Sequence, residues 1–242
     1  MNAFESFVYL DVEKTGSTFI SRLLGLYCRE RCVGFEQHAA MGAGCDRSKF
    51  YFISVRDPLD AYLSLYSYGC GGKGRLMSRL VRDGMDDFYD ATPKGFARWL
   101  AYVLRPENAS ALREGYGAAD GGFAKLLGFQ SFRYFRLAVP DAPALIAQCD
   151  DVDALRRLHA AHALPTAVIR YERFVEDLCA LISGPLSHAM RDVEGALAYA
   201  RSAKPVNASE RVDAGGRDFA IPDRLRRRLG RREWLLGELF GY

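Results

Sequence analysis

Residues 7 to 27 carry the pattern of a strand, a short loop and a helix in direct succession. The apolar run 7–10 is typical of a buried strand, and apolar residues recur at helical spacing from 19 to 27. Between them lies EKTGST, residues 13–18. Gly16 allows close backbone approach, Lys14 supplies a positive charge, and the first helical turn presents unpaired N–H groups. The segment therefore predicts a loop that binds an anion.

This loop does not have the residue order of a Walker A motif. That motif requires GxxxxGK[ST], in which the lysine follows the last glycine and a hydroxyl that binds Mg²⁺ comes next. Here Lys14 precedes Gly16, and no glycine stands five residues before Gly16. The order argues against a P-loop kinase or NTPase, which stays an alternative, and leaves the identity of the anion open.

A second segment, YFISVRDPLDAYLSLYSY (residues 51 to 68), indicates another strand followed by a helix. Arg56 stands at the carboxyl end of the strand. Asp57 is a typical N-cap, Pro58 suits the first helical position, and Ser64 follows two turns later. Open parallel sheets bind ligands at the carboxyl ends of their strands, so we expect Arg56 to lie beside the Lys14 loop.

The two segments together resemble the sulfotransferases that use 3′-phosphoadenosine 5′-phosphosulfate (PAPS). In that family a K-T-G-[ST]-[ST] loop grips the 5′-phosphosulfate, and an R-[DN]-P-x-[DE]-x-x-x-S-x-Y segment grips the 3′-phosphate. The matching residues are Lys14, Thr15, Gly16, Ser17 and Thr18 in the first motif and Arg56 and Ser64 in the second. Glu13 stands where the family most often has proline.

Two later segments are weaker similarities. VIRYERFVEDL (168 to 178) looks like a strand-to-helix segment of the family. KPVNASER (204 to 211) looks like the late Asn-x-Ser loop of carbohydrate-type members, which implies that Asn207 and Ser209 lie near the nucleotide. The resemblance covers roughly the whole chain and implies one domain, residues 1–242. We expect a P-loop-containing, sulfotransferase-like α/β fold with a central, mostly parallel sheet flanked by helices.

Periodicity and turn signals place the individual elements. Strands are predicted near 7–12, 50–55 and 166–170, with a short one near 33–36. Helices are predicted near 17–30, 58–68, 76–83, 94–104, 123–137, 152–162, 172–182, 190–201 and 223–240. The stretch from about 76 to 162 is therefore all-helical, and we interpret it as an insertion on the acceptor side.

The segment GFEQHAAM (34 to 41) lies between the two nucleotide motifs and offers a general base. It resembles the short His-Ala segment of carbohydrate-type members, in which the histidine removes a proton from the acceptor. His38 is the first candidate, because an imidazole suits that work near neutral pH. Glu36 is the second, because some relatives use a glutamate in this region.

The function that the resemblance implies is transfer of a sulfuryl group from PAPS to a hydroxyl, or an amine, of a carbohydrate, lipid or other small acceptor. Adenosine 3′,5′-bisphosphate is the other product. Lys14 would stabilise the charge on the leaving phosphate, and Lys14 and Arg56 together would replace a metal ion. A non-catalytic nucleotide-binding protein of the same fold stays open as an alternative. No nucleic-acid partner is expected.

Charge is concentrated near the C-terminus of a chain whose net charge is +3. Six arginines fall between residues 224 and 232, and leucines lie on one side of the same predicted helix. This basic amphipathic helix either packs on the domain with a solvated arginine face or offers a surface to an anionic partner, such as a membrane. We expect a cytoplasmic protein, with peripheral membrane contact as an option. Its six scattered cysteines fit a reducing compartment.

Overall fold

The computed structural model describes residues 1–112, 114–117, 122–202 and 221–242. The chain divides into two compact units. The first comprises Met1–Arg56, Arg133–Ala142 and Arg156–Asn207, and the second comprises Asp57–Phe132, Pro143–Leu155 and Ala208–Tyr242. The expectation of one domain stays a prediction.

The first unit contains a mixed five-stranded sheet in the order β3-β1-β2-β4-β5. Its parallel part is β2 (Phe7–Leu10), β4 (Phe50–Val55) and β5 (Ala167–Arg170), with Tyr9 opposite Phe52 and Ile53 opposite Val168. The edge strands β1 (Asn2–Ala3) and β3 (Gly34–Phe35) pair antiparallel with each other, and β1 pairs antiparallel with β2. The α/β class and the four predicted strands are confirmed, whereas β1 was not predicted.

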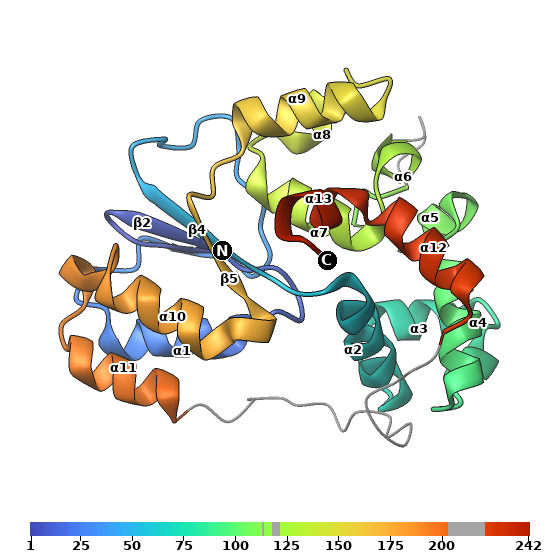
Figure 1. Ribbon diagram of the computed structural model, residues 1–242, viewed down its shortest axis with the longest axis horizontal. Coiled ribbons are helices and arrows are strands. Elements are labelled where there is room, and N and C mark those ends of the chain that lie inside the picture. The colour runs from blue at the N-terminus through green and yellow to red at the C-terminus, as the bar shows by residue number, and fades with distance from the viewer. Residues whose placement is uncertain (113, 118–121, 203–220) are drawn as a thin grey trace. The chain divides into compact units, whose positions relative to one another are not determined.

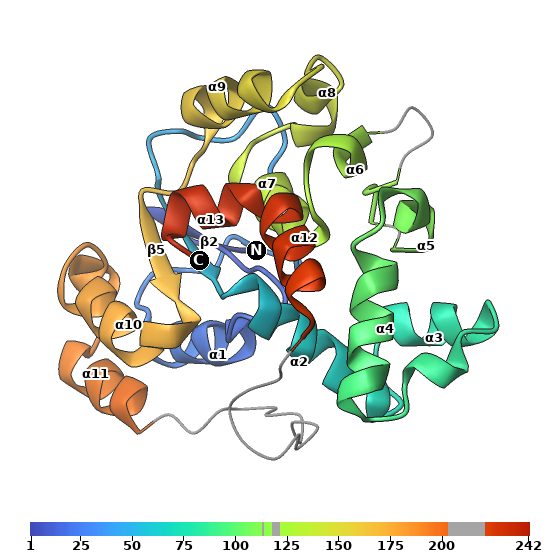
Figure 2. The same cartoon turned by 45° about the vertical axis from the view of Figure 1, so that its right-hand side comes forward.

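One face of the sheet is covered by α1 (Ser17–Tyr27), α10 (Phe174–Ser183) and α11 (Val193–Arg201), as Figures 1 and 2 show. The core on this face combines strand residues with the apolar stripe of α1, and the rings of Tyr9 and Phe52 stack with centroids 4.9 Å apart. Residues on the opposite face of β2 and β4, such as Val8 and Ile53, are also buried. Strands buried on both faces explain why their sequences are continuously apolar.

The described part of the second unit is helical. Its elements are α2 (Pro58–Cys70), α3 (Arg75–Arg82), α4 (Pro93–Val103), α5 (Ala109–Leu112), α6 (Gly122–Leu126), α12 (Asp223–Arg232) and α13 (Trp234–Phe240). Three helices contribute residues to both units: α7 (Phe129–Ala138), α8 (Ala142–Ile146) and α9 (Val152–His162). Short 3₁₀ turns occupy Asp86–Phe88, Pro106–Asn108, Tyr171–Arg173 and Ser187–Ala189. The predicted helical middle is confirmed where it is described.

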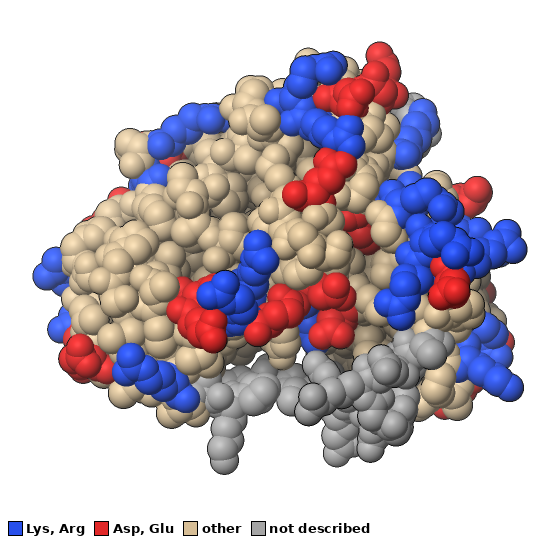
Figure 3. All heavy atoms as spheres, viewed as in Figure 1, with Lys and Arg blue, Asp and Glu red and all other residues tan. Residues whose placement is uncertain are grey.

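The arginine-rich segment forms α12, and basic side chains gather over this helix in Figure 3. Leu225 and Leu229 are buried in the second unit, whereas Arg224, Arg226 and Arg227 are exposed. The helix therefore packs through its leucines and keeps a solvated basic face. Its contact with an anionic partner stays a prediction. Among the residues described, no helix is long and apolar enough to cross a membrane.

The predicted helix 223–240 is broken at Glu233, whose side chain turns into the interior of the second unit. Its carboxylate accepts hydrogen bonds from the Tyr62 hydroxyl at 2.5 Å and from the backbone N–H of Ser131 at 2.7 Å. It thereby caps the first turn of α7, where a negative charge is favoured. A Cβ at Gly128 would lie 2.2 Å from Glu233 Oε1, so glycine leaves the space that this carboxylate occupies.

The buried carboxylate should make stability depend on pH. Burial raises the pKa of Glu233 above its ordinary value of 4.5. From pH 4.5 up to the raised pKa, the folded protein holds a proton that the unfolded chain has released, so the free energy of unfolding should fall as pH rises.

Urea unfolding of wild type and Glu233→Gln across pH 4 to 8 measures this pH dependence. The contributions of the other titrating groups cancel in the difference between the two free energies of unfolding. The wild type should lose stability relative to the variant as pH rises through this window. If the wild type instead gains stability relative to the variant as pH rises, the pKa of Glu233 is not raised in the folded protein.

Candidate functional site

The loop between β2 and α1 has a backbone shape that requires glycine. Gly16 is the N-cap of α1 and has φ +87°, in the left-handed region. A Cβ there would lie 2.5 Å from the Phe174 ring. The Gly16 carbonyl accepts from the N–H of Phe19 at 3.0 Å, within the first turn. The amides of Ser17 and Thr18 precede that bond and are those that a helix leaves for a ligand.

A buried chain of hydroxyl groups ties this loop to two parallel strands. The Thr15 hydroxyl donates to the Val12 carbonyl at 2.7 Å and lies 2.5 Å from Ser54 Oγ, which is 2.7 Å from the Tyr9 hydroxyl. Because a carbonyl only accepts, Thr15 gives its single proton to Val12, Ser54 donates to Thr15, and Tyr9 donates to Ser54. The Thr15 side chain thus supports the loop and is not a donor to a ligand.

Positive charge is concentrated around the loop. Arg56 follows β4, is 7% exposed and donates from Nη1 to the Lys14 carbonyl at 3.2 Å. Arg133 on α7 is 4% exposed and pairs with Glu13 at 2.8 Å (Nη2 to Oε2). Burial lowers the pKa of Lys14, Glu13 acts in the opposite direction, and Arg133 and Arg56 lower it further. A bound anion would relieve the repulsion among these cations.

Arg56 is oriented by an aromatic ring that directly follows the next parallel strand. Its guanidinium carbon lies 4.1 Å from the centroid of the Tyr171 ring, a cation–π contact. Tyr171 directly follows β5, and the Asp177 carboxylate accepts from the backbone N–H of Arg170 at 2.9 Å. The segment 168–178, a weak similarity in the sequence, thus holds the strand end against which Arg56 rests.

His38 is held at the end of β2 by the residue that follows this strand. Its Nδ1 lies 2.6 Å from the carbonyl oxygen of Asp11, and its backbone N–H donates to the Asp11 carboxylate at 3.1 Å. Because the carbonyl can only accept, Nδ1 carries the proton in the neutral ring and Nε2 carries the lone pair. The Asp11 carboxylate is buried and also accepts from the amino group of Met1.

The other predicted site residues are Glu36, Ser64, Asn207 and Ser209. Glu36 is exposed, two residues before His38. Ser64 is half-buried on α2 in the second unit, where Asp57 caps the helix as predicted by accepting from Asp60 N–H at 3.0 Å. Asn207 and Ser209 lie outside the described residues. Within the described part of the chain, no group of three or more His, Cys, Asp or Glu residues is arranged to hold a metal ion.

Comparison with protein-family models, with curated proteins and with solved structures found no match. The chemistry proposed below therefore rests on the motifs and on the geometry of this site.

Sequence reasoning did not single out several residues that build the site. Asp11, which positions His38, has only one sequence signal: it is an acidic residue directly after a buried strand. Ser54 is a small polar residue inside the apolar strand β4, where a polar group needs a buried partner. Arg133 on α7 is buried beside Glu13.

Proposed function

We propose that this protein transfers a sulfuryl group from PAPS to a hydroxyl of a small acceptor, or alternatively to an amine. The observation that carries the proposal is that an anion-binding loop and an oriented base are both held at the end of β2. The Lys14 loop follows β2, and Asp11, the residue directly after β2, holds His38 with Nδ1 protonated. A cationic loop by itself binds an anion, whereas a loop accompanied by an oriented base also suits group transfer.

In the proposed reaction the acceptor O–H loses its proton to His38 Nε2 as its oxygen forms a bond to sulfur. The bond from sulfur to the 5′-phosphate oxygen breaks, and its electron pair remains on that oxygen. The products are a sulfate ester and adenosine 3′,5′-bisphosphate, and the proton stays on the imidazole until solvent accepts it. Attacking and leaving oxygens must be in line, as in phosphoryl transfer.

Charge stabilisation in this reaction is assigned to the loop. Lys14 would donate to the oxygen that departs, where negative charge grows, and the amides of Ser17 and Thr18 would hold the phosphate. Arg56 would hold the 3′-phosphate through its planar guanidinium, with Ser64 adding a hydroxyl and Asn207 and Ser209 approaching the nucleotide. The buried setting of Arg56 over Tyr171 supports this role, because a fixed guanidinium loses little freedom on binding.

The nucleotide half of the proposal predicts selective stabilisation by the bisphosphate. At a concentration about 100 times Kd, adenosine 3′,5′-bisphosphate should stabilise the fold by about 2.7 kcal/mol, a rise of several degrees in Tm. Differential scanning fluorimetry without added metal measures the shift. AMP is the matched control, because it lacks only the 3′-phosphate. Equal shifts with the two nucleotides would remove the assignment of Arg56 and Ser64 to that phosphate.

A further inference from the structure

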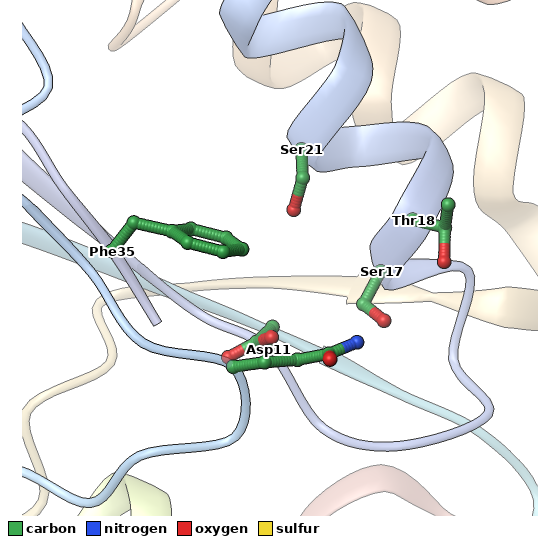
Figure 4. A pocket seen from close by; sticks show the side chains of 6 residues that line it. Asp11, Ser17, Thr18, Ser21 and Phe35 are labelled. Atoms are coloured by element: carbon green, nitrogen blue, oxygen red, sulfur yellow. The ribbon is translucent and has the colours of Figure 1, made fainter.

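A hollow of about 150 Å³ lies in the first unit beside the first two turns of α1. Its lining comprises Asp11, Ser17, Thr18, Ser21, Phe35 and Gln37. Figure 4 shows the hydroxyls of α1 on one side of the hollow and the Phe35 ring reaching toward it from the other. The hollow therefore has one aromatic wall and one polar wall.

The hollow adjoins both parts of the proposed reaction centre. It shares Ser17 and Thr18 with the anion loop, and it shares Asp11 with the contacts that hold His38. In the sheet order, β3, which carries Phe35, lies on the opposite side of β2 from β4, which leads into Arg56. A nucleotide that reaches Arg56 would thus leave this side of β2 to a second ligand.

The chemistry of the lining selects a class of ligand. Phe35 is 65% exposed, so the face of its ring is available for stacking, which is unusual for so large an apolar side chain. Ser21 Oγ accepts from Asn2 Nδ2 at 3.1 Å, which leaves the Ser21 proton available to a ligand, and Gln37 offers both a donor and an acceptor. Asp11 is the one charged residue of the lining and its charge is matched by the amino group of Met1, which suits a neutral ligand.

We propose that this hollow binds one neutral sugar ring of the acceptor, with the C–H face of the ring on Phe35 and its hydroxyls on Ser21 and Gln37. A pyranose combines an apolar face with a rim of hydroxyls, which matches the two walls, whereas a simple phenol has one hydroxyl for several polar groups. This inference rests on the proposed function and names the substrate class of the same site.

Direct ligand binding tests the inference without requiring turnover. Saturation-transfer difference NMR with a set of neutral methyl hexopyranosides should show transfer to ring C–H protons of at least one glycoside. Phe35→Ala should raise the Kd of that glycoside by about two- to tenfold, which corresponds to the loss of one ring contact. Phe35→Trp should retain binding. Val33→Ala is the matched control, because Val33 is a 50% exposed apolar residue near β3 outside the lining.

The alternative results separate the two proposals. Absence of transfer to every glycoside, or equal binding by wild type and Phe35→Ala, overturns the sugar site. Binding of 4-nitrophenol that depends on Phe35, without glycoside binding, overturns the sugar class. Stabilisation by adenosine 3′,5′-bisphosphate is measured on the same samples. Glycoside binding without bisphosphate binding supports the hollow as a sugar site and counts against sulfuryl transfer.

Discussion

Lys14→Ala is expected to lower kcat by about 10²- to 10³-fold, which is the usual cost of removing one donor that stabilises developing charge. The negative charge on the departing phosphate is larger in the transition state than in bound PAPS, so the loss should appear in kcat more than in nucleotide affinity. The acceptor is first identified by incubating small-molecule extracts with the protein and PAPS and detecting a gain of SO₃ by mass spectrometry. Steady-state kinetics with that acceptor, and calorimetry with adenosine 3′,5′-bisphosphate, then give the two quantities.

Two further lysine variants sharpen this test. Lys14→Arg retains a positive charge and should lose less activity than Lys14→Ala, although its planar group donates from a different place. Lys94→Ala removes an exposed lysine from α4 and should leave kcat unchanged. If Lys14→Ala weakens nucleotide binding as much as it slows turnover, Lys14 contributes only to ground-state binding and the proposed role is wrong.

His38→Ala is expected to reduce kcat by about 10²- to 10⁴-fold while leaving the affinity for adenosine 3′,5′-bisphosphate nearly unchanged. The imidazole is assigned to the acceptor oxygen, and its Nδ1 lies against Asp11. The same kinetic and calorimetric measurements apply, with circular dichroism to verify that the fold is retained.

Glu36→Ala is the matched comparison for the base. Glu36 is exposed two residues from His38, so a loss of activity confined to Glu36→Ala would move the base to that carboxylate. A wild-type protein that binds the bisphosphate but transfers sulfuryl to no acceptor would favour the alternative of a nucleotide-binding protein without catalysis.

Elements with local signals were predictable from the sequence. β2 and β4 are continuous apolar runs, and α2 begins at an Asp-Pro pair that caps its own first turn. The Lys14 loop was predictable for the same reason, because glycine, lysine and helix start are adjacent in the chain. In each case the interactions that decide the structure join residues close in sequence.

Features decided by distant contacts were not predictable. Nothing near Glu233 indicates that a helix will break there, because the carboxylate is drawn inward by Tyr62 and the start of α7. Asp11 acquires its role only when His38 folds back onto it, 27 residues further along the chain. β1 is two residues long and owes its existence to pairing with β2 and β3, so it has no periodicity to detect.

The hydroxyl chain from Tyr9 through Ser54 and Thr15 to the Val12 carbonyl has a thermodynamic consequence for the loop above it. Each hydroxyl donates its only proton to the next oxygen, so only one arrangement of donors is possible. The hydroxyl groups are thus already fixed in one orientation. The loop is therefore already fixed before any ligand arrives. Binding of an anion there costs little conformational entropy, and more of the contact enthalpy remains as affinity.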